Sequence, residues 1–358
     1  MTNSGKYLFS AAVCAVLALV SVSCSRNTGY VALSGYAQGG TYSVKINMDG
    51  VVPGADELKA GIDSILNAVD NSLSGYNKGS LLSRFNQGER VRPDSMLLDI
   101  YRLSKGYYDM TEGAVDVSAG ALFDIWGFGF TTDSMPSDED VAAVKKYIGM
   151  DRLASDMASA VGPDGCVSAS DIVTDGHPEH LPELNFNAVA QGFTCDVIAS
   201  YLKDNGVEDM LVDVGGEIFC KGVNPQGKPW TIGVDKPVDG NEVSGADLKG
   251  ILQAGPGECG VVTSGNYRKF YVRDGCKYAH TIDPSTGYPV THSLLSATVV
   301  ASDAAEADAL ATYCMVLGLD RASEYISSRD DVEGYLIYQD SDGSMKTWKS
   351  SGFRLISE

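Results

Sequence analysis

Helical spacing of apolar residues predicts long helices in three stretches of the chain. The first runs from Pro53 to Leu73 and the second from Asp94 to Tyr108. The third, Asn187 to Asn205, is followed by Gly206, a residue type that commonly ends helices. A further helix is predicted from Ser137 to Ile148.

Other stretches have the pattern of β-strands. Apolar and polar residues alternate from Gly40 to Met48 and again from Trp230 to Val234, as in half-buried strands. Met210 to Val214 is mostly apolar, which predicts a buried strand. Residues 150–184 show no clear period, and we expect strands joined by an exposed loop there.

The segment from Thr263 to Thr312 carries strong local signals. The turn Asp274-Gly275 separates two β-rich runs, so Val261–Val272 and Cys276–Ile282 are predicted to pair as a hairpin. Leu294–Ala301 is a predicted strand. A helix capped by Ser302 or Asp303 is expected to follow it and to stop at Gly318.

On that last helix, Asp308 and Thr312 are four residues apart and therefore share one face. A carboxylate and a hydroxyl side by side suit a hard cation such as Mg²⁺. Such a pair is also common on solvated helix faces, so the metal interpretation depends on further signals in the chain.

Composition and charge narrow the classes of function. The 358 residues are 44% hydrophobic and 21% charged, which is ordinary for a globular protein. The net charge is −20, with no run of Lys or Arg, which argues against nucleic acid or an anionic membrane surface as a partner. Binding of a polyanion would therefore need a metal ion or local N–H groups.

The N-terminus is predicted to be a targeting segment. Lys6 precedes an apolar run from Leu8 to Val22, which is shorter than the roughly 20 residues of a membrane-spanning helix and fits a signal peptide over residues 1–23. Small residues before Cys24 resemble a bacterial lipobox, so lipidation of Cys24 is predicted; an ordinary cleaved signal is the alternative. Residues 24–36 are then a polar tether, and residues 37–358 the folded domain.

Six cysteines follow Cys24, and none has C-x-x-C or metal-ligand spacing. Several lie in apolar runs and are predicted to be buried. In an oxidising compartment two of them could form a disulfide, but the sequence does not indicate which two. The nucleotide-binding patterns G-x-G-x-x-G and Walker A are absent, which disfavours those two binding modes.

Taken together, the motifs resemble the ApbE family of FAD:protein FMN transferases, which are periplasmic lipoproteins in many bacteria. The resemblance extends from Gly40 to about Gly318. Its matching motifs, in the family's order, are Gly40-Thr41-Tyr42, Leu73–Tyr76 with Ser83–Asn86, Gly113–Asp116 with Trp126–Gly129, Asn187–Gly192, Asp213–Gly216, Thr263–Gly265, His280–Gly287 and Ala307–Thr312.

The resemblance implies a function and a set of site residues. Members move FMN from FAD to a Thr or Ser hydroxyl of a partner protein, release AMP and require Mg²⁺. Asp308 and Thr312 match metal-binding side chains, Ala188 matches a position whose carbonyl binds the metal, and His280 matches the proposed base for the acceptor hydroxyl. The positions matching FAD contacts are Tyr76, Ala114, Val115, Asp116, Asn185, Gln191 and Ile282.

Two residues depart from the family's pattern. Asn185 stands where many members have Asp, and Gln191 where many have Lys. Both replacements retain hydrogen-bonding groups and lose a charge.

The expected fold is α+β, with two mixed lobes of antiparallel sheets and flanking helices and the ligand in the cleft between them, as in ApbE-like, T-fold-like proteins. The expected acceptors are membrane redox subunits such as those of the sodium-pumping NADH:quinone oxidoreductase (Nqr) or the Rnf complex. Two alternatives stay open: an FAD pyrophosphatase that gives free FMN and AMP, and a flavin-binding lipoprotein without chemistry. The expected location is the periplasmic side of a bacterial membrane.

Overall fold

A large antiparallel sheet organises the molecule. The computed structural model describes residues 29–128, 135–238, 245–255, 257–266, 270–273 and 276–357. Eight strands pair in the order β1-β2-β3-β4-β7-β12-β13-β14. These strands are β1 (Tyr30–Ala37), β2 (Gly40–Asn47), β3 (Met210–Val214), β4 (Glu217–Lys221), β7 (Cys259–Gly265), β12 (Leu294–Ala301), β13 (Glu333–Gln339) and β14 (Met345–Lys349).

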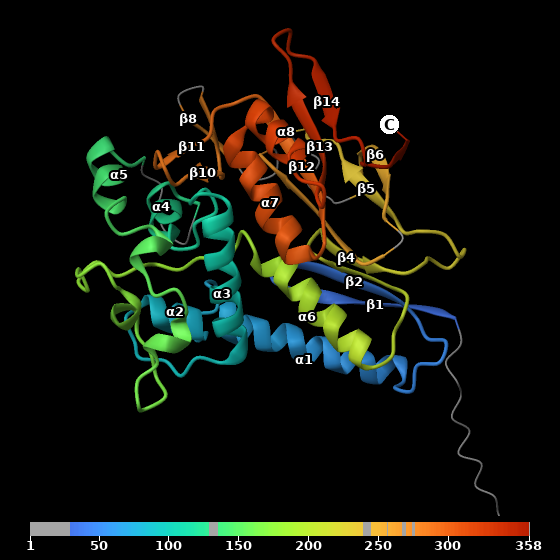
Figure 1. The fold of residues 1–358 in the computed structure, drawn as a ribbon, viewed down its shortest axis with the longest axis horizontal. Helices are drawn as coiled ribbons and strands as arrows, with labels where there is room; N and C mark the ends of the chain where they lie inside the picture. Colours follow the sequence, from blue (N-terminus) through green and yellow to red (C-terminus); the bar gives the residue numbers. More distant parts are fainter. Residues whose placement is uncertain are drawn as a thin grey trace, which may run out of the picture.

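Each face of this sheet is covered by a different layer. Helices α1 (Ala55–Leu73), α6 (Ala190–Asp204), α7 (Ala304–Leu317) and α8 (Leu319–Ser327) pack on one side, as Figure 1 shows for α1, α6 and α7. A small sheet lies against strands β3, β4, β7 and β13 through a shared apolar core. Its strands are β5 (Thr231–Asp235), β6 (Leu248–Gln253) and β15 (Leu355–Ser357).

A second group of elements forms the other lobe, on the left in Figure 1. It is built of short helices, two small hairpins and extended loops that pack on α1, α7 and the C-terminal strands. Its elements are α2 (Leu81–Asn86), α3 (Ser95–Met110), α4 (Gly120–Ile125), α5 (Asp138–Val144), the 3-10 helices η1 (Met150–Arg152), η2 (Met157–Ala160) and η3 (Ala169–Ile172), and strands β8 (Phe270–Arg273), β9 (Cys276–Ala279), β10 (Ile282–Asp283) and β11 (Tyr288–Pro289). The α+β class with two mixed lobes is thus confirmed.

Several predicted elements differ from the observed ones. Residues 150–184 contain 3-10 helices and isolated bridges instead of the expected strands. Single apolar side chains of this stretch pack into the core, without the alternation of a strand. The helix after Ser137 ends at Val144. Helix α6 begins at Ala190, since the N–H groups of Val189 and Ala190 both donate to the Phe186 carbonyl in a turn.

The hairpin around Asp274-Gly275 is shorter than predicted. Arg273 pairs with Cys276, so β8 and β9 form the hairpin, while the two turn residues lie outside the described residues. The residues from Cys259 to Gly265 instead form β7 and join the large sheet. The predicted strand Val261–Val272 is therefore two strands with different partners.

The N-terminal prediction also needs one correction. Residues 30–36, expected in the polar tether, belong to β1, which pairs with β2 along eight residue pairs from Tyr30↔Asn47 to Ala37↔Gly40. Leu33 of this strand is buried, which gives the strand an apolar anchor in the core. The predicted signal peptide and Cys24 lie outside the described residues, and none of the described helices is long and apolar enough to cross a membrane.

Candidate active site

The predicted metal-binding side chains lie where two helices begin. Asp308 is only 5% exposed, one turn into α7, and Thr312 follows one turn later. Asp308 Oδ2 accepts a hydrogen bond of 3.1 Å from the backbone N–H of Gly192, in the first turn of α6. This bond joins positions that are 116 residues apart in the chain.

Ala188 precedes Val189, the N-cap residue of α6. The Val189 carbonyl accepts from the N–H of Phe193 at 2.9 Å, which is a regular helical bond. One position earlier, the N–H of Gly192 donates to Asp308, although a helix would direct it to Ala188. The Ala188 carbonyl is therefore not needed by the helix, in agreement with a role as a metal ligand.

The start of α7 is held in place from two sides. A Cβ on Gly192 would lie 2.3 Å from the carbonyl oxygen of Ala304, and a Cβ on Gly260 would lie 2.1 Å from that of Asp303. Only glycine allows so close an approach of α6 and β7 to this helix end. Asp196 of α6 then accepts from the N–H groups of Ala304 and Ala305, at 2.9 and 2.8 Å.

Without a cation, the buried negative charges around this junction destabilise the fold. Burial and the negative charge of Glu217 raise the pKa of Asp308 well above its usual range, against a smaller opposite effect of the Gly192 N–H. Burial also raises the pKa of Asp196 to about 7, although two N–H groups stabilise its charged form. A divalent cation at Asp308 would offset this repulsion, so the residues present fit such an ion.

The positions predicted to contact the flavin nucleotide form a second group of residues. Ala114, Val115 and Asp116 follow α3, and the N–H of Asn185 donates to the Val117 carbonyl at 2.7 Å. Asp116 Oδ1 accepts from the N–H and Oγ of Ser118 at 2.9 and 2.6 Å. Burial raises the pKa of Asp116 to about 6, against the opposite effect of these two bonds, which join the carboxyl to its own loop.

The segment that carries Asn185 continues toward the predicted metal ligands. Asn86 of α2 holds the preceding residue, Leu184, by a donated and an accepted bond of 2.8 and 2.9 Å. At the far end, Gln191 Nε2 lies 2.0 Å from where a Cβ of Gly215 would be. One short stretch thus connects the positions 114–116 with α6 and with the turn between β3 and β4.

The loop that carries His280 and Ile282 packs on α4. Ile282 is 3% exposed and contacts a cluster that includes Ala119 and Trp126. Trp126 Nε1 donates to the Gly287 carbonyl at 2.8 Å. The His280 ring meets Phe128 edge-on, with 6.5 Å between ring centroids. Because the N–H of Ala119 donates to the Asp116 carbonyl, this loop is joined to positions 114–116.

Tyr76 differs from the other predicted residues because its side chain is 65% exposed. It lies in the turn between α1 and α2, next to Gly75, whose carbonyl accepts from Ser83 Oγ at 3.3 Å. Aromatic rings with an exposed face stack on planar ligands, which is the role predicted for Tyr76.

Comparison with known proteins gives a consistent result. The ApbE family model matches residues 38–336. The FAD:protein FMN transferases of Vibrio cholerae and Haemophilus influenzae are each 33% identical to this chain, over 94% and 99% of it and over 95% and 99% of their own lengths. The chain belongs to the ApbE family.

Solved structures of ApbE proteins have the same fold. The flavin transferase ApbE from Vibrio cholerae superposes with a TM-score of 0.72 at 32% identity, covering 91% of this chain and 98% of that one. The apo form of the flavinyl transferase ApbE from Pseudomonas stutzeri gives a TM-score of 0.75 at 28% identity, covering 90% and 95%.

The structure gives roles to residues to which sequence reasoning assigned none. Gly192 and Gly260 permit the close contacts of α7, Asp196 caps its first N–H groups, and Glu217 brings a second negative charge toward Asp308. Asp196 follows the buried Thr194 and Cys195, and an acidic residue in such a run was the available signal.

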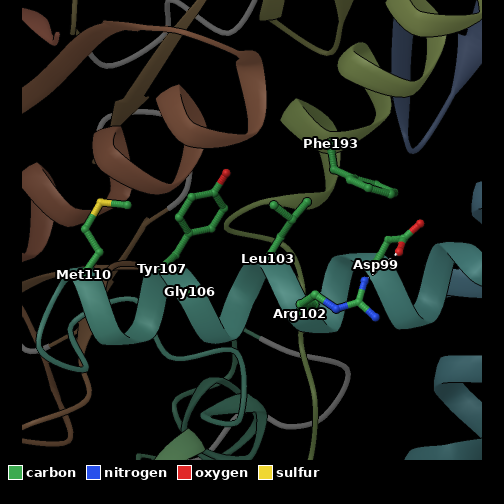
Figure 2. A pocket seen from close by; sticks show the side chains of 7 residues that line it. All are labelled: Asp99, Arg102, Leu103, Gly106, Tyr107, Met110 and Phe193. Atoms are coloured by element: carbon green, nitrogen blue, oxygen red, sulfur yellow. Dashed lines mark hydrogen bonds and ion pairs between the residues drawn. The ribbon is translucent and has the colours of Figure 1, made fainter. Parts of the chain in front are cut away.

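A hollow of about 550 Å³ lies between α3 and α6, but it is lined by none of the predicted site residues. Figure 2 shows Leu103, Tyr107 and Met110 projecting from α3 toward it, with Phe193 of α6 opposite. Asp99, Arg102 and Gly106 complete the lining. The position of the flavin ligand in the cleft between the lobes stays a prediction.

Proposed function

We propose that this chain transfers FMN from FAD to a Ser or Thr hydroxyl of a partner protein and releases AMP. The observation that carries the proposal is the buried Asp308, held by the first turn of α6 in a chain with full-length similarity to FAD:protein FMN transferases. A buried carboxylate near a second acidic group is a poor arrangement for stability alone and a good one for a cation.

The cation we propose is Mg²⁺, held by Asp308, Thr312 and the Ala188 carbonyl. All three offer oxygen ligands, which this ion prefers. When bound, it supplies positive charge to the pyrophosphate oxygens of FAD. The rigid contacts of Gly192 and Gly260 with the start of α7 hold Asp308 in position before FAD arrives.

In the reaction, the acceptor hydroxyl oxygen attacks the phosphorus on the FMN side of the pyrophosphate. The bond from that phosphorus to the bridging oxygen breaks, and AMP leaves with the oxygen. We propose that His280 takes the hydroxyl proton, because a neutral hydroxyl is a weak nucleophile and an imidazole is a suitable base near neutral pH.

The flavin nucleotide would be held by the second group of residues, the predicted flavin contacts. The Tyr76 ring is exposed and suited to stacking, while Asn185 and Gln191 offer amide groups. Val115 and Ile282 are buried, so their part is through the backbone, and the carboxyl of Asp116 is already bound to Ser118. Ala114 is the remaining predicted contact in this loop.

We further propose that Cys24 carries a lipid anchor and that the domain faces the periplasm. The support is the short apolar run before Cys24 and the small residues that precede it. The proposed acceptors are Nqr-type or Rnf-type redox subunits, which stand at a membrane.

Mass spectrometry of a candidate acceptor domain tests the proposal. We expect incubation with this protein, FAD and Mg²⁺ to add the mass of FMN, as a phosphoester, to one Ser or Thr, and EDTA to prevent it. An unmodified acceptor with free FMN and AMP in solution would instead establish an FAD pyrophosphatase. Unchanged FAD across a panel of acceptor domains would leave a flavin-binding protein and refute the transferase.

A further inference from the structure

Two cysteines from neighbouring strands face each other in the core. Cys220 of β4 and Cys259 of β7 are direct partners in the antiparallel ladder, after Ile218↔Val261 and Phe219↔Gly260. Their Sγ atoms are 3.5 Å apart. Among the cysteines whose side chains the structure describes, these two alone have their sulfur atoms in contact.

The strand pairing is compatible with a cross-strand disulfide, because the two cysteines lie directly opposite each other. Directly opposed residues in antiparallel strands have Cα atoms about 4.5–5.5 Å apart, within the range of about 4.4–6.8 Å found in disulfides. A disulfide requires an S–S distance of about 2.05 Å. From 3.5 Å, rotation of the two side chains closes this gap without a change of strand register.

The surroundings favour a stable bond. Cys220 and Cys259 are 1% and 7% exposed and belong to the apolar core between the large and small sheets, with Trp230, Leu252 and Tyr335. The S–H of Cys220 lowers the pKa of Cys259, and the same contact together with burial raises that of Cys220.

We propose that Cys220 and Cys259 form a disulfide when the chain meets an oxidant of the disulfide class, such as oxidised glutathione or a thiol–disulfide oxidase. The Cys259 thiolate attacks one sulfur of the oxidant, and one thiolate leaves. The Cys220 thiolate then attacks the sulfur of Cys259 in the mixed disulfide and expels the second thiolate. Two cysteine thiols lose two protons and two electrons, and the oxidant is reduced to two thiols.

The disulfide would join β4 to β7 close to the start of helix α7. Gly260, next to Cys259, is the residue that touches the Asp303 carbonyl at the start of that helix. The closed loop would contain β5 and β6, so the small sheet would be held against the large one. This inference does not depend on the proposed transferase activity, and such a bond persists where the compartment is oxidising.

The test uses the full chain in a glutathione redox buffer, followed by acid quenching, alkylation of thiols in denaturant and peptide mass spectrometry. We expect a peptide pair joined through Cys220 and Cys259, 2 Da lighter than the sum of the two thiol peptides. The oxidised form should unfold roughly 5 °C higher than the reduced form, and dithiothreitol should reverse the shift.

Matched variants distinguish this disulfide from reactions of the other cysteines. Cys220→Ala and Cys259→Ala should each lose the joined peptide and the redox-dependent part of the unfolding temperature. Cys166→Ala, in a loop of the other lobe, should retain both. The proposal is overturned if the unmodified chain shows both cysteines alkylated as free thiols, or joined to other partners, under oxidising buffer. That result does not require any variant to fold.

Discussion

The candidate active site has two halves that are built in different ways. The metal half, which comprises the predicted metal ligands and the contacts around them, consists of helix starts in the core, where backbone approaches backbone at Gly192 and Gly260 and where Asp308 and Asp196 accept backbone N–H bonds. The flavin half consists of loops from α1–α2, from the end of α3 and from the segment around His280, and it includes the exposed Tyr76. The first half is therefore held by close backbone contacts, whereas the second combines buried positions such as Val115 and Ile282 with the exposed ring of Tyr76.

The largest expected effect comes from the loop that carries His280. His280→Ala should lower transfer by about 10²–10⁴-fold, since the acceptor hydroxyl loses its base, while FAD binding is kept. Single-turnover transfer and FAD titration measure the two effects. His177→Ala, on an exposed loop, is the control. If His280→Ala abolished FAD binding, His280 would be a binding residue and the role as base would be wrong.

The next effect belongs to the metal half. Asp308→Asn should lower transfer by at least about 10²-fold, because the cation contributes several kcal/mol of charge stabilisation. Its fold should remain, since the substituted amide is neutral at a site that disfavours charge. Full activity at millimolar Mg²⁺ would refute the metal assignment. Asp330→Asn, at an exposed position, should leave the rate unchanged.

A substitution that disturbs the packing of the metal half should lower the free energy of unfolding. Gly192→Ala places a Cβ 2.3 Å from the Ala304 carbonyl, so we expect a loss of ~1–3 kcal/mol in the free energy of unfolding. Gly106→Ala, in helix α3, meets no atom within 4 Å and should gain ~0.5–1 kcal/mol. Urea denaturation compares them. Equal stabilities would show that the α6–α7 contact is loose.

The buried cap of α7 should make stability depend on pH. In the folded state the pKa of Asp196 is raised to about 7, so the folded chain binds a proton that the unfolded chain has released. Stability from this residue is present near pH 4 and is lost as the pH rises toward 7, by about 1–2 kcal/mol between pH 5 and 7. Asp196→Asn should flatten that part of the urea-unfolding profile, and an unchanged slope would contradict the assignment.

The smallest effect is expected at the exposed ring of the flavin half. Tyr76→Ala should weaken FAD binding by about 2- to 10-fold through lost stacking, and Tyr76→Phe should restore it. The free energy of unfolding should stay the same, because the side chain is 65% exposed. A large loss of stability would place Tyr76 in the structural core instead.

Local signals predicted the helix that carries Asp308 well. Asp303 caps α7 and Gly318 ends it, as expected, because capping and helix termination depend on neighbouring residues. The strand Leu294–Ala301 was also predicted with its observed bounds, since it is a long apolar run between polar residues. Fold class and family followed from ordered motifs over most of the chain.

Contacts between distant residues could not be predicted in the same way. The bond from Gly192 to Asp308 and the fit of Gln191 beside Gly215 depend on how α6 meets α7 and β3. Strand β1 was missed because its partly polar sequence is stabilised by pairing with β2. Residues 150–184 were assigned wrongly because single apolar residues anchor the 3-10 turns.

The long separation between Gly192 and Asp308 has a consequence for the order of events during synthesis. A chain that is delivered N-terminus first presents positions 114–116 and Asn185 before the residues of α7. Its metal half therefore forms only after a contact of high sequence separation has closed, which is a slow class of folding step. A chain truncated before Ala304 carries the predicted flavin contacts but lacks Asp308 and Thr312, so we expect such a product to have no transfer activity.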